Sequence, residues 1–286
     1  MANTFTLLAL LFVPGPEQAS IKMRDLLQHT AMKTVNWIMA GIPQPVPDQV
    51  ALRNCRIISH RGEHDNISVI ENTLPAFDTA RANGVWGIEC DIRWTADLIP
   101  VIYHDSCGQR LFGNPARVSE LAFADLRAQM PLIPSLTELA GEFGGNTHLM
   151  LEIKAEHYPQ LQRQKAILRE QLSTLSPGLD YHFLALEPEL FARVDFVPRN
   201  VCLPVAQLNT SRLSRAALTT RCGGLSGHFL LLTDKLRQRH ELAGQRVGTG
   251  FISSKNCLFR ELNRGIEWIF SNDAVKLQKI RDHYLQ

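Results

Sequence analysis

The stretch Ile88-Glu89-Cys90-Asp91-Ile92 decides the fold, because it has the pattern of a buried strand that carries two acids. Side chains two residues apart in a strand point the same way, so Glu89 and Asp91 share one face. Core strands rarely carry charged residues unless these are paired or bind a metal, since burying an uncompensated ion is costly. The stretch therefore predicts a core strand that ends in a chemical site or in structural salt bridges.

Three further apolar stretches end in charge in the same way. They are Ile57-Ile58-Ser59-His60-Arg61-Gly62, Val101-Ile102-Tyr103-His104-Asp105 and Leu149-Met150-Leu151-Glu152-Ile153-Lys154. The four stretches supply three carboxylates, two imidazoles and two fixed cations, which can hold a divalent metal, bind a phosphate and move protons. Structural salt bridges explain one such pair well, but they explain four charged strand ends less well.

Strand and helix patterns alternate eight times from Arg56 onward. The predicted strands lie near 56–60, 86–92, 148–154, 181–187, 201–207, 223–228, 245–252 and 266–271. The predicted helices lie near 73–83, 135–143, 157–174, 188–196, 211–219, 234–243, 256–264 and 274–284. The 286 residues, 45% of them hydrophobic, are enough for an α/β barrel of about 250 residues. The sequence thus predicts a TIM (β/α)8 barrel with its chemistry at the carboxyl ends of the strands.

One segment breaks the alternation. The stretch Trp94-Thr95-Ala96-Asp97-Leu98-Ile99-Pro100 has the composition of a turn, and the apolar run Val101–Tyr103 follows it. So few residues cannot cross over to a parallel strand, which predicts a β-hairpin insertion after the second strand. With the turn centred near residues 96 and 97, we expect His104 opposite Glu89.

Residues 1–55 are predicted to form a short N-terminal helical extension, ahead of a barrel domain at 56–286. A helix over Ser20–Met39 would pack on the barrel, and a proline-rich linker at 41–47 would end it. The apolar run Leu7–Val13 is shorter than the roughly 20 residues that span a bilayer. No Lys or Arg precedes Lys22, so we expect a cytoplasmic protein without a transmembrane segment, and a cleaved signal stays an alternative.

Composition limits the partners. The 30 basic and 28 acidic side chains give a net charge of +2, which argues against a broad nucleic-acid surface. The six cysteines form no Cys-x-x-Cys pair, so reduced thiols are expected and a zinc site is not. The sequence does not indicate an oligomeric state.

The ordered motifs between residues 56 and 154 resemble the glycerophosphodiester phosphodiesterase family. The motifs are His60-Arg61-Gly62, Glu71-Asn72-Thr73-Leu74-Pro75-Ala76-Phe77, Gly87-Ile88-Glu89-Cys90-Asp91, Thr95-Ala96-Asp97, Pro100-Val101-Ile102-Tyr103-His104-Asp105, Ile133-Pro134-Ser135-Leu136 and Leu151-Glu152-Ile153-Lys154. The resemblance implies a phosphodiesterase barrel that uses a divalent cation. It also implies hydrolysis of deacylated phospholipids, such as glycerophosphocholine, to glycerol 3-phosphate and an alcohol.

The resemblance implies that Glu89, Asp91 and Glu152 are the metal ligands. Oxygen-only ligation also favours a hard ion, either Mg²⁺ or Ca²⁺. His60 and His104 would be the acid/base pair, since imidazole titrates near neutral pH. Water and a neighbouring glycerol hydroxyl of the substrate both remain possible nucleophiles.

Three further residues are expected at the substrate. Arg61 would bind the phosphate through its forked donors, and Lys154 would add a positive charge near the phosphate or the glycerol. Asn72 is either a substrate-binding residue or part of a helix start at Asn72 or Thr73, with Pro75 in the first turn.

The departures from the family pattern lie mostly in the second half of the chain. Asp97 is followed by Leu98 rather than Gly, and the ends of three later strands read Leu184-Ala185-Leu186-Glu187, Gly250-Phe251-Ile252-Ser253 and Ser271-Asn272-Asp273-Ala274. These changes leave the chemical core intact and alter the region expected to form the alcohol and glycerol pocket. Two alternatives therefore remain: a sphingomyelinase D-like phospholipase that forms a cyclic phosphate, and a non-catalytic phosphate-binding barrel.

Overall fold

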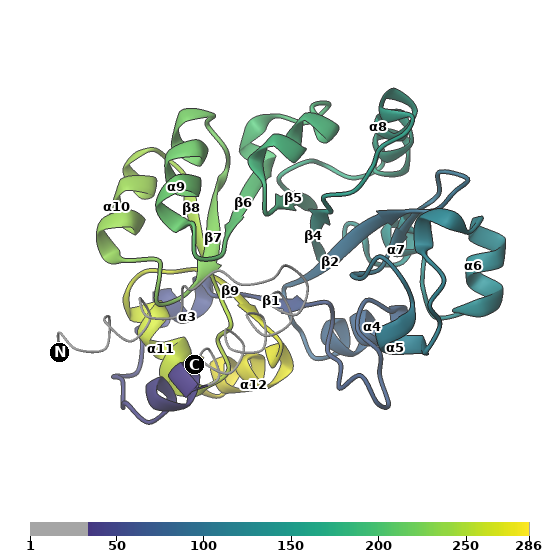
Figure 1. The fold of residues 1–286 in the computed structure, drawn as a ribbon. Coiled ribbons are helices and arrows are strands. Elements are labelled where there is room, and N and C mark those ends of the chain that lie inside the picture. Colours follow the sequence, from purple (N-terminus) through teal and green to yellow (C-terminus); the bar gives the residue numbers. More distant parts are fainter. Residues whose placement is uncertain (1–33, 286) are drawn as a thin grey trace, which may run out of the picture.

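The computed structural model describes residues 34–285, and in this part of the chain eight parallel strands close into a barrel (Figure 1). The barrel strands are β1 (Arg56–His60), β2 (Gly87–Trp94), β4 (His148–Ile153), β5 (Tyr181–Ala185), β6 (Cys202–Ala206), β7 (Gly224–His228), β8 (Arg246–Gly250) and β9 (Trp268–Ser271). The β1–β2 and β1–β9 pairings close the sheet. The predicted TIM barrel is confirmed.

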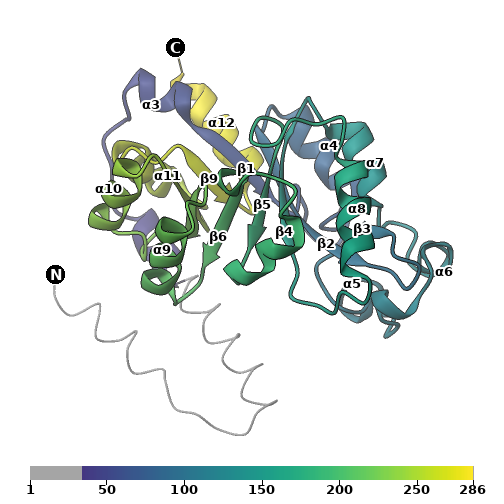
Figure 2. The ribbon, with the colours of Figure 1, turned by 90° about the horizontal axis from the view of Figure 1, so that it is seen from above.

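Helices surround the strands, as Figure 2 shows from above. They are α4 (Leu74–Ala82), α7 (Leu136–Phe143), α8 (Leu161–Gln171), α9 (Thr210–Thr219), α10 (Asp234–Leu242), α11 (Lys255–Asn263) and α12 (Ala274–Tyr284), with the 3-10 segments η2 (Pro188–Val194) and η3 (Arg199–Val201) between β5 and β6. The helical stretch predicted near 188–196 forms a 3-10 helix at Pro188–Val194. Pro188 opens that segment, and Leu190, Phe191 and Val194 are buried by a tighter turn.

Alternation along the strands creates two cores. Inward-facing apolar residues fill the barrel, and they are Ile58, Met150, Leu184, Leu203, Trp268 and Phe270. Their strand neighbours face outward, so that Ile57, Leu149 and Phe183, for example, pack against the helices. Full burial of each large apolar side chain stabilises the folded state by about 1.5–3 kcal/mol. This burial therefore determines which face of each strand points into the barrel. The same alternation turns Glu89, Asp91 and Glu152 inward.

The hairpin forms as predicted, but with a different register. β3 (Pro100–Ile102) pairs antiparallel with β2 so that Arg93 faces Val101, and the Tyr103 N–H donates to the Asp91 carbonyl at 2.9 Å. His104 therefore lies one residue away from the expected position opposite Glu89. The physical reason is the turn, whose centre lies at residue 97 and not between residues 96 and 97. Leu98 adopts a left-handed φ of 65° in this turn.

A small lobe follows the hairpin and was not predicted. It comprises α5 (Gln109–Phe112), η1 (Val118–Glu120) and α6 (Phe123–Gln129). Its own core contains Val101, Tyr103, Val118, Leu126, Met130 and Ile133. α7 then begins at a capping box, in which the Ser135 side chain accepts from the Glu138 N–H and the Glu138 carboxylate accepts from the Ser135 N–H.

The described part of the N-terminal extension is helical at 34–40 and again in α3 (Gln49–Asn54). Leu52 of α3 is fully buried in the barrel's outer core, and its carbonyl accepts from Arg281 Nε of α12 at 2.9 Å. The predicted apolar run at 7–13 and most of the helix at 20–39 lie outside the described residues. The division at residue 56 stays a prediction.

The structure also bears on the cysteines and on membrane-spanning helices. All six cysteines of the chain lie in the described part and are free thiols. Between residues 34 and 285, no helix combines the length and apolarity needed to cross a bilayer.

Two neutral histidines occupy the amino-terminal end of the barrel interior, opposite the charged site. His148 Nδ1 donates to the Leu179 carbonyl at 2.9 Å, so its Nε2 accepts from His182 Nδ1 at 2.8 Å. His148 also stacks on Trp86 at 4.3 Å, and His182 meets the edge of Trp268 at 5.1 Å. Burial lowers the pKa of His148 to about 4, and burial together with the His148 charge lowers the pKa of His182 to about 3.

This arrangement predicts acid-sensitive stability. A histidine with a lowered folded-state pKa favours the native state above pH 6.5, and the advantage is lost as pH falls toward the folded pKa. The variant His182→Gln should show a shallower decline in the free energy of unfolding between pH 7 and pH 5, by roughly 1–2 kcal/mol. Urea titrations at both pH values measure this. Equal declines in the free energy of unfolding of the two proteins would show that His182 is exposed to solvent in the native state.

Candidate active site

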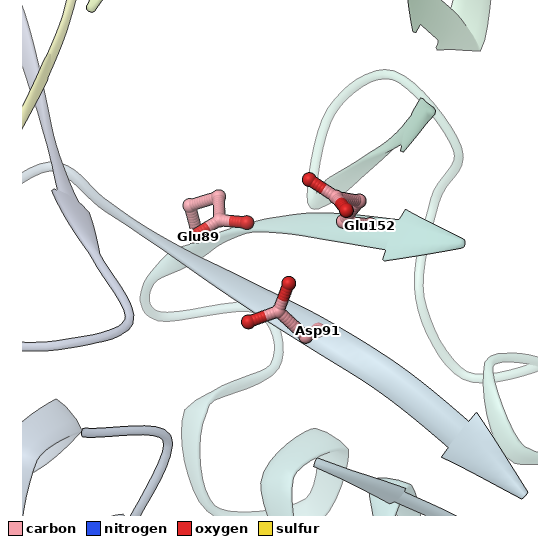
Figure 3. Close-up of side chains that lie close together, drawn as sticks. All are labelled: Glu89, Asp91 and Glu152. Atoms are coloured by element: carbon pink, nitrogen blue, oxygen red, sulfur yellow. The ribbon is translucent and has the colours of Figure 1, made fainter. Parts of the chain in front are cut away.

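Three carboxylates converge at the carboxyl ends of two neighbouring strands. Glu89 and Asp91 lie on β2, and the β2–β4 register places Asp91 beside Glu152 (Figure 3). One ligand atom from each residue lies within 4.8 Å of the others. Glu89 and Asp91 are only 2% and 1% exposed. The structure thus brings together the three predicted metal ligands.

Cationic and amide groups surround Asp91. Lys154 Nζ lies 2.5 Å from Asp91 Oδ1 and 2.5 Å from Glu152 Oε1, while Arg61 Nε lies 3.4 Å from Asp91 Oδ2. Asn72 Nδ2 donates to Asp91 Oδ2 at 2.7 Å. Each group comes from a different segment, so this carboxylate ties together β4, the turn after β1 and the approach to α4.

The pKa shifts show how charge is balanced in the cluster. Burial raises the pKa of Asp91, but Lys154 and Arg61 outweigh it and hold that pKa below its usual range. Burial and the charges of Asp91 and Glu152 instead raise the pKa of Glu89 well above its ordinary value. The cluster therefore has surplus negative charge that the nearby side-chain cations leave uncompensated. Three oxygen donors with surplus negative charge fit a hard divalent cation.

The turn after β1 explains the His60-Arg61-Gly62 motif. Arg61 has a left-handed φ of 60°, and its N–H donates to the Glu89 carbonyl at 2.8 Å. Gly62 follows at φ 79°, where a Cβ would lie 2.7 Å from the Ala76 Cβ, so glycine is required by both conformation and space. The turn directs the Arg61 guanidinium to Glu71, with Nη1 2.9 Å from Oε1.

The two predicted acid/base histidines have different partners. His60 Nδ1 donates to the Asn272 amide oxygen at 2.6 Å, which leaves Nε2 as the lone-pair nitrogen, 3.7 Å from Glu89 Oε2. Burial, with a smaller contribution from the Arg61 charge, lowers the pKa of His60 to about 4. His104 Nδ1 donates to Asp105 Oδ1 at 2.7 Å, which leaves its Nε2 free of that bond. Both rings thus have a fixed orientation.

Sequence reasoning did not assign roles to four residues at the site: Glu71, Asp105, Arg110 and Asn272. Glu71 and Asp105 lie beside predicted residues in quoted motifs, so their charge next to an apolar stretch was an available signal. Asn272 was noted as a departure from the family pattern. Arg110 has no periodic signal, because it lies in the irregular lobe after the hairpin.

Comparison with known proteins connects this geometry to a family. The family model described as "Glycerophosphoryl diester phosphodiesterase family" matches residues 60–191. Over this range the chain is similar to this family. The match begins at His60 and includes the three carboxylates, Arg61, Asn72, His104 and Lys154.

Curated relatives match about half of the chain. Glycerophosphodiester phosphodiesterase 1 of Bos taurus is 29% identical over 179 residues, or 55% of this chain and 52% of that protein. The Homo sapiens protein of the same name is 30% identical over 179 residues, with the same coverage. The chain thus spans about half the length of the curated relatives it matches.

Solved structures agree on the fold. A glycerophosphodiester phosphodiesterase from Thermotoga maritima has a TM-score of 0.66 at 18% identity and covers 79% of this chain and 98% of its own. An Oleispira antarctica phosphodiesterase, solved with the product sn-glycerol-3-phosphate, has a TM-score of 0.68 at 22% identity and covers 79% and 96%. At these identities the likeness shows the barrel fold.

Asn72 gives a test of how the site is built. It has a left-handed φ of 57°, which Asn tolerates better than Ala. Asn72→Ala should lower the free energy of unfolding by about 2–4 kcal/mol, because it combines backbone strain with loss of the bond to the Asp91 carboxylate. Asn72→Gly loses the same bond without the strain and should cost about 1–2 kcal/mol less. Equal losses in urea titrations would contradict the left-handed assignment.

Proposed function

We propose that this chain is a phosphodiesterase that hydrolyses glycerophosphodiesters to glycerol 3-phosphate and an alcohol. The observation that carries the proposal is the cluster of Glu89, Asp91 and Glu152 within 4.8 Å, with His60 and Arg61 beside it. Clusters of this kind at the carboxyl end of a barrel are typical of catalytic sites. The names of the relatives and the glycerol-3-phosphate complex of a structural neighbour support this substrate class.

The three carboxylates would hold one divalent ion, Mg²⁺ or Ca²⁺. Bound there, the ion would supply positive charge against the phosphoryl oxygens. The carboxylate oxygens of β2 and β4 match the ligands that both ions prefer, and the raised pKa of Glu89 marks the charge that a cation would neutralise.

Arg61 would bind a phosphate oxygen with the donors that Glu71 does not use. The bond to Glu71 holds the guanidinium plane in place before substrate arrives. Lys154 would contribute a second positive charge near the phosphate, and its bonds to Asp91 and Glu152 hold it there. Asn72 would help by orienting the Asp91 carboxylate.

His60 would be the general base and His104 the general acid. The Asn272 amide accepts the Nδ1 proton of His60, so the Nε2 lone pair can take a proton from the nucleophile. Asp105 orients the His104 ring through Nδ1, so that Nε2 can carry the proton that the departing alkoxide needs. Proton removal and proton delivery are then the tasks of two separately oriented rings.

The metal assignment predicts loss of both binding and activity. Glu89→Gln and Asp91→Asn should each lower kcat/KM on glycerophosphocholine by roughly a hundredfold or more and weaken Mg²⁺ or Ca²⁺ binding in calorimetry. Chelation of the wild type should abolish turnover, and added metal should restore it. Glu170→Gln, at an exposed position on α8, is the matched control. Full turnover by the chelated protein would exclude a metal role for this cluster.

The histidine assignment predicts non-additive losses. His60→Ala and His104→Ala should each lower kcat by roughly 10²–10⁴-fold. Because both serve one reaction, the double variant should be little slower than the slower single variant. His157→Ala removes an exposed histidine in the loop after β4 and should keep full activity. A double variant whose loss equals the product of the two single losses would contradict the pairing.

A further inference from the structure

Arg110 binds two carboxylates, Glu71 and Asp105, which lie next to residues of the proposed site. It lies on the one-turn helix α5 in the lobe after the hairpin, and its side chain is 44% exposed. Nη2 donates to Glu71 Oε1 at 2.6 Å and Nη1 to Glu71 Oε2 at 3.1 Å, while Nε donates to Asp105 Oδ2 at 2.6 Å. The guanidinium thus engages both acids through its fixed fork of donors.

Each of these carboxylates also holds a site residue. Glu71 Oε1 accepts from Arg61 Nη1 at 2.9 Å, and Asp105 Oδ1 accepts from His104 Nδ1 at 2.7 Å. A continuous series of charge-assisted hydrogen bonds therefore runs from His104 through Asp105, Arg110 and Glu71 to Arg61. The two ends come from opposite sides of the site, the hairpin lobe and the turn after β1.

The series rests on fixed elements at both ends. Glu71 is 3% exposed and also accepts from Asn66 Nδ2 at 2.7 Å. Burial raises the pKa of Glu71, but the hydrogen bonds from Arg110 and the charge of Arg61 outweigh it and lower that pKa to about 2. On the lobe side, the Phe112 ring packs on the buried Tyr103 ring at 5.9 Å, which anchors α5.

We propose that Arg110 is a positioning residue that aligns the His104 imidazole with the Arg61 guanidinium by binding Asp105 and Glu71 at once. The proposal rests on the proposed function. Without Arg110, Asp105 can rotate away from His104, and Glu71 loses two of its bonds and can move with Arg61. A lysine would give one ammonium in place of the fork, so it could replace either contact but not both.

A purely structural role for Arg110 would be to tether the lobe to the barrel. The two roles differ in their dependence on the leaving group. Loss of His104 alignment should affect a poor alkoxide leaving group strongly and a p-nitrophenolate leaving group weakly, because the latter departs without a proton. Loss of the tether alone should affect both substrates equally.

The test compares kcat/KM on glycerophosphocholine and on glycerol 3-phosphate p-nitrophenyl ester. The proteins are wild type, Arg110→Ala, Arg110→Lys, His104→Ala and the control Arg117→Ala. Arg117 belongs to the same lobe, is 57% exposed and pairs with Glu120 at 3.7 Å. His104→Ala defines how much of the rate on each ester depends on the general acid.

We expect Arg110→Ala to lose roughly a hundredfold on the choline ester and about tenfold on the aryl ester, with Arg110→Lys intermediate. Millimolar guanidinium ion should restore part of the Arg110→Ala activity, while Arg117→Ala should match the wild type. Equal losses on the two esters, or an Arg110→Ala rate like that of Arg117→Ala, would overturn the proposal. If Arg110→Ala does not fold, Arg110→Lys carries the same comparison.

A wild-type protein without activity on both esters would instead contradict the proposed function. Thermal denaturation of every variant separates a folding defect from a defect in alignment. A lower midpoint with an unchanged ratio of the two rates is the outcome that a tether alone would give.

Discussion

The buried Asp91 carboxylate is the constraint on which the carboxyl end of the barrel depends. At 1% exposure, its charge would cost several kcal/mol without compensation. Compensation comes from Lys154 at 2.5 Å, Arg61 at 3.4 Å and Asn72 at 2.7 Å. These residues end β4, follow β1 and precede α4. One buried charge thus fixes three loops that are far apart in the sequence, and the left-handed backbone at Arg61 and Asn72 is the local strain that this requires.

Buried polar groups are stabilised in different ways at the two ends of the barrel interior. At the carboxyl end, opposite charges are paired and a surplus of negative charge remains on the side of Glu89. At the amino end, His148 and His182 stay neutral, bond to each other and are enclosed by the Trp86 and Trp268 rings. Between the ends, an apolar layer that includes Met150, Leu184 and Phe270 separates the charged site from the neutral one. Alternation along the same strands produces all three layers.

The segment after β3, including the small lobe, contributes side chains to the site from the side opposite the turn after β1. It carries Asp105 and Arg110, it has its own apolar core, and its hydrogen bonds to Glu71 connect it to the turn after β1. A family likeness over residues 60–191 includes this lobe, whereas the strands from β6 onward lie outside that match. The residues of the proposed metal and phosphate site therefore lie in the part of the chain that the family model matches, whereas the departures at 250–253 and 271–274 lie outside it.

The sequence by itself determined the eight strand–helix alternations that predict the barrel, because each pattern is local. It also determined that Glu89, Asp91 and Glu152 lie on the inward faces of β2 and β4, because side chains alternate every two residues along a strand. It also determined that β3 must turn back, since a short connection allows nothing else. Only the tertiary structure decided which residues face each other across the site. His104 lies one residue from its expected position because the backbone conformation of Leu98 sets the turn. His60 bonds to Asn272, which lies 212 residues away, and Arg110 bonds to Glu71 across 39 residues. Such contacts depend on the closure of the barrel and on the packing of irregular loops, neither of which leaves a periodic pattern in the sequence.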